Sequence, residues 1–248
     1  MKSTNPTLTL ITAAHEDLDG LRRFHDLIMP ILSDDFQWII KDSGACACSA
    51  EWALSLTSNH IHFLSSPDDG IYSALNEAIR QSKSPYYIVA GLDDTLYTNS
   101  LRQLIDCLSS QPLNNFGVLT FPVKVNNKTL HPKRWYPLHL SVRGLLASHS
   151  VGTVIRKSVH EDFGYYDESY KILADSLFIK KSFLGGVKFI HFQKPIMGEF
   201  STEGISSKYH SLRLLEAYDY NVSSGSSVFV QSLWLALRTI RTKINRFR

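Results

Sequence analysis

The sequence of 248 residues lacks the signatures of several large protein classes. It contains three cysteines, Cys46, Cys48 and Cys107, an odd number without the spacing of a disulfide scaffold or a zinc site, so we expect reduced thiols. No stretch of about 20 apolar residues is present that could span a membrane. The N-terminus also lacks the long apolar core of a signal peptide. These absences predict a cytoplasmic protein, free or peripheral on the inner face of a membrane.

Two common nucleotide-binding motifs are missing as well. No segment matches G-x-x-x-x-G-K-[ST], and the first predicted strand is not followed by G-x-G-x-x-G. Both absences argue against P-loop NTPases and dinucleotide dehydrogenases. A phosphorylated ligand would therefore have to be held through a metal ion and loop contacts.

Acidic residues are absent after Asp219, and this makes the charge uneven. The 26 basic and 23 acidic residues give a net charge of +3. Five of the cations lie in the last eleven residues, and without them the rest of the chain carries a charge of about −2. A nucleic-acid-binding domain needs positive charge across its binding surface, so we expect no nucleic-acid partner.

What the sequence does contain is an alternation of short apolar runs and amphipathic segments. With 44% hydrophobic residues the chain has the composition of a globular protein. Such alternation is typical of β-α-β units and predicts a mixed, mostly parallel sheet with helices on both faces. The predicted strands of the first half are Thr7–Ala14, Phe36–Lys41, Ile61–Leu64 and Tyr86–Ala90, and the predicted helices run from Asp17 to about Leu32 and from Ile71 to Gln81.

The second half is less regular. We expect strands at Phe116–Val125, Ser150–Arg156, 187–191 and 196–200, and helices at Ala174–Leu184 and 206–218. The chain is therefore divided into one domain, 1–222, and a C-terminal helix, 223–248. Within the domain, residues 1–115 form the more regular half and 116–222 the less regular half.

Four carboxylates follow predicted strands of the first half: Asp42, Asp68, Asp93 and Asp94. In open α/β sheets, ligands bind outside the carboxyl ends of the strands. A single Asp there is often only a turn residue. The adjacent pair Asp93-Asp94 would repel itself unless a cation relieved the repulsion, and Mg²⁺ often binds one or two carboxylates together with substrate phosphates. The pair thus predicts a metal–diphosphate site.

Several ordered motifs resemble the family 2 glycosyltransferases, which have the Rossmann-like GT-A fold. The segment S-P-D-D-G-I-Y-S-A-L-N-E-A-I at 66–79, followed by Asp93-Asp94, is similar to a family segment that precedes the metal motif. Further similar segments are I-T-A-A-H-E-D at 11–17, W-I-I-K-D-S-G-A at 38–45, Y-D-E-S-Y-K-I-L-A-D-S-L-F at 166–178 and G-I-S at 204–206. The resemblance covers roughly residues 7–210 and is strongest to bacterial enzymes of O-antigen and capsule synthesis.

This resemblance implies an inverting hexosyltransferase that moves a sugar from a nucleotide sugar, typically a UDP-sugar, to an acceptor hydroxyl. It implies a divalent cation, Mn²⁺ or Mg²⁺, at Asp93 and Asp94, and a general base at Asp175. The implied donor-nucleotide residues are Thr12, Ala13, Asp42, Asp68 and Asp93.

The implied acceptor is a glycan or a lipid-linked saccharide. Candidate acceptor or phosphate contacts are His149, Trp135 and Ser206, although His149 could equally be a structural, hydrogen-bonded residue and packing is the default role of Trp135. Asp175 could instead be a helix N-cap. Two positions depart from the family pattern, because Ala47 and Leu177 stand where the family has an Asp.

Those departures leave two other functions open. One is a catalytically inert protein of the same fold that binds nucleotide sugars or serves as a scaffold. The other is a nucleotidyltransferase, although His15-Glu16-Asp17 occupies the place of its glycine-rich phosphate loop.

The C-terminal segment has the pattern of a basic amphipathic helix. Such a helix can lie on an anionic membrane, or it can pack on the body of the protein or on a second copy in a homo-oligomer. Its apolar positions fall within an arc of about 100° at helical spacing. They are Phe229, Leu233, Ala236, Leu237, Ile240, Ile244 and Phe247.

Overall fold

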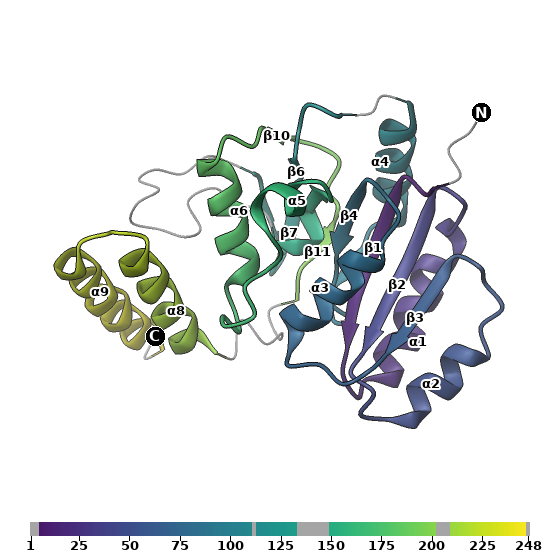
Figure 1. Cartoon of the computed structure of the whole chain (residues 1–248), viewed down its shortest axis with the longest axis horizontal. Helices are drawn as coiled ribbons and strands as arrows, with labels where there is room; N and C mark the ends of the chain where they lie inside the picture. Colours follow the sequence, from purple (N-terminus) through teal and green to yellow (C-terminus); the bar gives the residue numbers. More distant parts are fainter. Residues whose placement is uncertain (1–4, 111–112, 133–148, 202–208, 247–248) are drawn as a thin grey trace.

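The computed structural model describes residues 5–110, 113–132, 149–201 and 209–246. Among these residues, seven strands form a central sheet in the order β10-β6-β9-β4-β1-β2-β3 (Figure 1). All neighbouring strands are parallel except β9, which is antiparallel to both β4 and β6. The strands are β1 (Leu8–Ala14), β2 (Phe36–Asp42), β3 (Ile61–Ser65), β4 (Tyr86–Val89), β6 (Val118–Thr120), β9 (Thr153–Arg156) and β10 (Phe189–His191).

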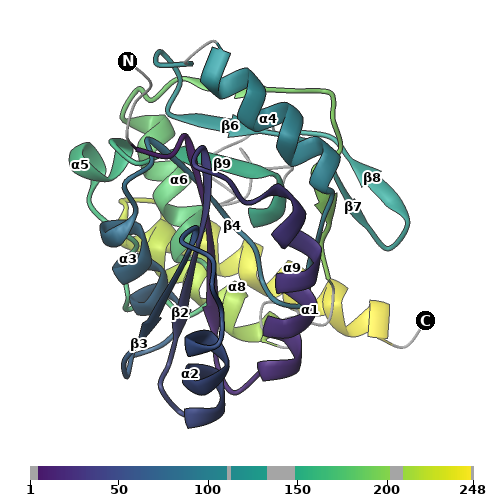
Figure 2. The same cartoon turned by 90° about the vertical axis from the view of Figure 1, so that its right-hand side faces the viewer.

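Helices cover both faces of this sheet, and Figure 2 shows the sheet between them. Successive side chains of a strand point to opposite faces of the sheet. In β1, Leu8 and Leu10 pack with one set of helices, and Ile11 packs with the other. The first set is α1 (Leu18–Ile28) and α4 (Thr98–Ser110); the second is α3 (Ile71–Gln81), α5 (Val159–Phe163) and α6 (Ala174–Leu184). The predicted fold class, a mostly parallel sheet flanked by helices, is confirmed.

The prediction of one strand over Phe116–Val125 is wrong. The chain forms β6, turns at Pro122 and continues as β7 (Val123–Val125), which belongs to a second sheet. Proline has no N–H for a strand ladder, so a strand interrupted there can change sheets. The second sheet has the order β5-β11-β7-β8, with β5 (Thr95–Leu96), β11 (Gly198–Glu199) and β8 (Lys128–Leu130).

Two other local predictions differ from the structure. The predicted strand Ser150–Arg156 begins with a 3₁₀ turn, Ser150–Gly152, before β9. The expected reduced thiols are also wrong for one pair, since Cys46 and Cys48 form a disulfide. Cys46 has an extended backbone at the start of α2 (Ala47–Leu54), and this places the two Cα atoms 5.3 Å apart, within disulfide range.

The C-terminal segment forms a helical hairpin of α8 (His210–Ser223) and α9 (Val228–Arg246), joined by residues 224–227. The hairpin lies beside α6, at the opposite end of the molecule from β2, β3 and α2 (Figure 1). Among the described residues, none of the helices combines the length and the apolar content that a bilayer-spanning segment needs.

Candidate functional site at the carboxyl edge of the sheet

The parallel strands β1 to β4 bring most of the predicted site residues to one edge of the sheet. Ala14 is paired with Asp42 and Asp42 with Ser65, so β1, β2 and β3 end side by side. The loop that carries Asp93 and Asp94 follows β4 at the same edge. Because β9 runs the other way, its start lies at this edge too, and His149 comes just before it.

Asp42 is the last residue of β2 and is almost fully buried. Its Oδ2 accepts the N–H of Gly44 at 2.8 Å and the hydroxyl of Ser65 at 3.4 Å. Both of these hydrogen bonds fall on one oxygen. They fix the plane of the carboxylate, and Oδ1 takes part in neither of them.

Asp68 is held by a buried cation. Its Oδ2 lies 3.5 Å from Nζ of Lys41, a fully buried lysine that also lies 3.6 Å from Glu77 Oε2. Its Oδ1 accepts the N–H of Gly70, whose φ of 119° is open to glycine but strained for other residues. Lys41 Nζ further donates to the carbonyls of Asp42 and Ser66. Lys41 thus ties the loops after β2 and β3 together.

The two β1 residues differ in what they can offer a ligand. The hydroxyl of Thr12 is buried and accepts the indole N–H of Trp38 at 3.0 Å, so it belongs to the core. Ala13 is only partly buried and pairs with Lys41 across the β1–β2 ladder. The backbone around Ala13 is therefore the part of β1 that can flank a nucleoside.

Asp93 and Asp94 are adjacent in sequence but have opposite surroundings. Asp94 is buried, and its two oxygens accept the N–H groups of Gly91 at 2.9 Å and of Ser201 at 3.0 Å. Burial raises the pKa of Asp94 to about 6, and these hydrogen bonds oppose that rise. Asp93 is exposed, and its carboxylate fills the space where a Cβ on Gly91 would lie. Asp93 is thus the carboxylate that can reach a ligand.

Asp175 lies in the first turn of α6 rather than at its N-cap, which is Leu173. Its Oδ1 accepts the N–H of Ser176 at 2.7 Å and the hydroxyl of Tyr72, in α3, at 3.0 Å. The Tyr72 side chain is buried, and burial, together with the nearby carboxylate, raises its pKa far above the ordinary value. The phenol therefore stays protonated and donates, which holds the carboxylate of Asp175 in place.

Two further residues position this region, and sequence reasoning did not identify either role. Asn76 accepts the N–H of Tyr166 and donates to the Tyr166 carbonyl and to Glu168, so α3 holds the segment before α6. Glu216, in α8, is buried, and its carboxylate accepts the N–H groups of residues 171, 172 and 173 at 2.6, 3.0 and 2.9 Å. A negative charge at this place also suits the N-terminus of α6.

A buried cluster of polar side chains contacts the same segment, which precedes α6, from the side of β4. The hydroxyl of Tyr87 lies 2.6 Å from His160 Nε2 and 2.9 Å from the hydroxyl of Tyr166. Burial lowers the pKa of His160 to about 4, so the imidazole is neutral near pH 7. The Tyr166 ring packs edge-on against Tyr72, the partner of Asp175. The cluster therefore joins β4 to the region around Asp175.

His149 is connected to the Asp93-Asp94 turn by contacts of the neighbouring residues Phe200 and Ser201. Its ring stacks on Phe200 with centroids 3.8 Å apart, and the next residue, Ser201, donates to Asp94. Trp135 and Ser206 lie outside the described residues.

A hollow elsewhere in the molecule, between α8 and α9, is lined by none of the predicted site residues.

Within the described part of the chain, no group of three or more His, Cys, Asp or Glu side chains forms a ready-made metal site. Asp93 offers one exposed carboxylate, which fits a cation that takes most of its other ligands from a diphosphate and water. Asp94, with both oxygens bonded to backbone N–H groups, does not fit a second ligand in this conformation.

No family model and no curated protein sequence matches the chain. Solved structures do match. The mannosyltransferase PcManGT from Pyrobaculum calidifontis, in complex with GDP-Man and Mn²⁺, is 15% identical, with a TM-score of 0.65 over 94% of this chain and 71% of its own. Residues 1–349 of TarS from S. aureus, in complex with UDP-GlcNAc, are 12% identical, with a TM-score of 0.63 over 93% of this chain and 70% of that one.

The chain shares its fold, a mostly parallel sheet flanked by helices, with these two structures. It spans 42% of the longer TarS structure, with a TM-score of 0.57. At such low identity the likeness establishes the fold, and the activity has to be argued from the site.

Proposed function

We propose that this protein is an inverting glycosyltransferase that moves a sugar from a nucleotide-sugar donor to an acceptor hydroxyl. The proposal is carried by three carboxylates in a sheet with this fold: Asp42 ends β2, Asp93 lies in the loop after β4, and Asp175 accepts the hydroxyl of Tyr72, at the start of α3. Each has a different environment: one buried and oriented, one exposed, and one held by a tyrosine. Three such carboxylates suit base recognition, diphosphate binding and proton removal.

The donor side lies in residues 1–115. Asp42 Oδ1 would accept a hydrogen bond from the base, for which a UDP-sugar is our first candidate, while the backbone at Thr12 and Ala13 flanks the nucleoside. Asp68, tied to Lys41, shapes the loop of the nucleotide site. Asp93 would hold Mn²⁺ or Mg²⁺ on the diphosphate, and Asp94 keeps the turn in place. A divalent cation there would neutralise the charge that the leaving diphosphate gains.

The transfer step needs a single displacement. Asp175 takes the proton from the acceptor hydroxyl as its oxygen forms a bond to the anomeric carbon. The bond from that carbon to the donor phosphate breaks, and its electron pair leaves with the nucleoside diphosphate. Attack opposite the leaving group inverts the configuration. No covalent intermediate with the protein is required.

The acceptor side lies in residues 116–222. We propose a glycan or lipid-linked saccharide of a bacterial surface polysaccharide, such as O-antigen or capsule, as the acceptor. His149 lies next to the diphosphate side of the site and could contact a phosphate or the acceptor; Trp135 and Ser206 remain candidates for the acceptor sugar.

The test is a panel of UDP- and GDP-sugars with Mn²⁺ or Mg²⁺, scored for donor binding, donor hydrolysis and transfer to oligosaccharide acceptors. Asp175→Asn should bind the preferred donor as wild type does and lose transfer by roughly a hundredfold or more. Asp167→Asn is the matched control, because Asp167 is an exposed carboxylate in the preceding loop.

Transfer by Asp175→Asn at the wild-type rate would refute the assignment of the base. Donor binding without any turnover by the wild type would favour the inert binding protein instead. Formation of a nucleotide sugar from a sugar phosphate would favour the nucleotidyltransferase.

A further inference from the structure

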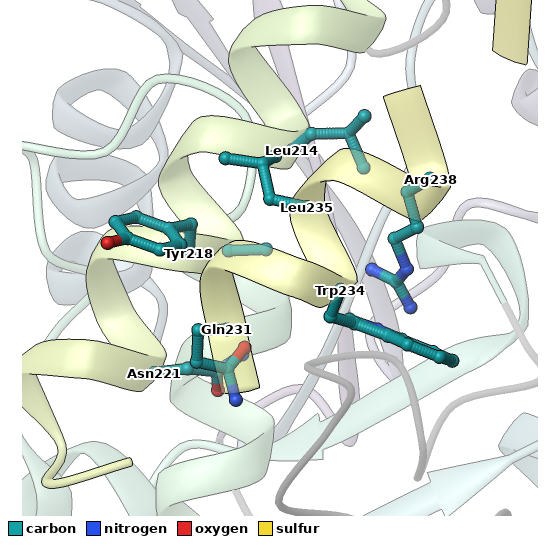
Figure 3. Close-up of a pocket in the computed structure, with 8 residues that line it drawn as sticks. Leu214, Tyr218, Asn221, Gln231, Trp234, Leu235 and Arg238 are labelled. Atoms are coloured by element: carbon teal, nitrogen blue, oxygen red, sulfur yellow. The ribbon is translucent and has the colours of Figure 1, made fainter. Parts of the chain in front are cut away.

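The helix α9 has an inner face that packs on α8. Gln231, Trp234, Leu235 and Arg238 line the contact with Leu214, Tyr218 and Asn221 of α8, and Figure 3 shows these side chains. The four α9 residues recur at the spacing of one helix face. Gln231 is buried and accepts the amide of Asn221, and the Arg238 guanidinium lies over the Trp234 ring.

The outer face of α9 is apolar and uncovered. Phe229, Leu233, Leu237 and Ile240 are 79%, 55%, 50% and 56% exposed. At 100° per residue, the centre of this set lies about 155° from the centre of the inner face. These side chains therefore point away from the hairpin. The sequence left open that this apolar stripe packs on the body of the protein, but in the structure the stripe is exposed.

The charge of the segment restricts what can cover that stripe. Residues 220–248 contain five arginine and lysine residues and no acidic residue. A second copy docked through the same face would bring together two segments that each carry five cations, with no carboxylate of the segment to pair them. A surface with anionic headgroups complements them.

We propose that α9 binds bilayers that carry anionic lipids, lying flat with its outer face inserted at the boundary between headgroups and acyl chains. The residue pattern suits this arrangement, because a surface helix needs a wide apolar stripe with cations beside it and not a fully apolar circumference. The inner face keeps the rest of the protein attached through α8. The proposal requires neither donor nor acceptor, so it is independent of the proposed transferase activity.

The experiment measures co-sedimentation of the full chain with vesicles of two parts phosphatidylcholine to one part phosphatidylglycerol, and with phosphatidylcholine alone. We expect binding to the anionic vesicles, weaker binding as salt is raised, and little binding to the neutral ones. Leu233→Gln together with Leu237→Gln should lower the affinity by about tenfold or more, because two inserted side chains lose their apolar contact.

Leu54→Gln is the matched control. Leu54 is 87% exposed on α2, and its change should leave vesicle binding as in the wild type. Circular dichroism and thermal denaturation check that every variant folds. The proposal is overturned if the wild type does not bind anionic vesicles, or if the Leu54 variant loses as much affinity as the α9 variant. It is also overturned if the α9 changes only dissociate a dimer, measured by light scattering, without altering vesicle binding.

Discussion

Residues 5–110 place Asp42 at the end of β2 and Asp93 in the loop after β4. In residues 149–246, by contrast, Asp175 is placed through side chains from several other elements. In the first region, the register of β1, β2 and β3 determines where the loops begin. In the second, Tyr72, Asn76 and Glu216 reach the segment around Asp175 from α3 and α8. We therefore expect single side-chain changes to disturb the second region more than the first.

The largest effect is expected for Glu216→Ala. It leaves three N–H groups before α6 without their acceptor, two of them buried, and should lower the free energy of unfolding by about 3 kcal/mol. Chemical denaturation measures this loss. Asp219→Ala, one turn further along α8, removes an exposed carboxylate that accepts the hydroxyl of Tyr170 and is the control. Similar values for both variants would show that Glu216 does not hold the segment.

A second prediction concerns pH, because the two regions contain buried groups that titrate in opposite senses. Asp94 has a folded pKa of about 6 against 3.8, so its native form binds the proton more tightly and stability falls as pH rises from about 4 to 6. His160 has a folded pKa of about 4 against 6.5, so its unfolded form binds the proton more tightly and stability rises over that window. Each contributes up to about 3 kcal/mol.

These opposing contributions can be separated by substitution. Urea denaturation between pH 4 and 6.5 should show a steeper rise of stability with pH for Asp94→Asn than for the wild type. His160→Gln should show a shallower rise or a fall. Slopes that change in the same direction for both variants would contradict the assignment.

The smallest effect is expected for Tyr72→Phe. The change removes one hydroxyl that donates to Asp175 and keeps the packed ring, so kcat should fall by about fivefold with little change in KM for the donor. Steady-state kinetics with the preferred donor tests this. Tyr97→Phe provides a comparison away from Asp175, since Tyr97 contacts Lys124. Equal kcat for Tyr72→Phe and the wild type would show that the Tyr72 hydroxyl does not position Asp175.

The sequence predicts the first region better than the second for physical reasons. The helix Ile71–Gln81 has the predicted bounds, because its apolar period is clear and Gly70 and Ser82 stand at its two ends. The helix Thr98–Ser110 was not predicted, although it buries Leu101, Leu104 and Leu108 at helical spacing. That period is a signal that could have identified it.

The second region depends on contacts that no local pattern contains. Pro122 ends β6 and diverts the chain to another sheet, a change that depends on which strand edges are free. The partners of Glu216 are backbone N–H groups 43 to 45 residues away. Almost every residue type has the same backbone N–H group, so residue identities do not indicate such a contact. The motif around 166–178 indicated Asp175, but the roles of Tyr72 and Asn76 in holding it needed the fold.

The central claim is that the first region binds a nucleotide sugar through one exposed carboxylate and a divalent cation. Calorimetric titration of UDP- and GDP-sugars, with and without Mn²⁺, tests it for the wild type and for Asp93→Asn. We predict that the wild type binds a preferred donor and that Mn²⁺ strengthens this binding. For Asp93→Asn, Mn²⁺ should have little effect on donor affinity. The absence of binding to any nucleotide sugar, or the same effect of Mn²⁺ in both proteins, would contradict the account.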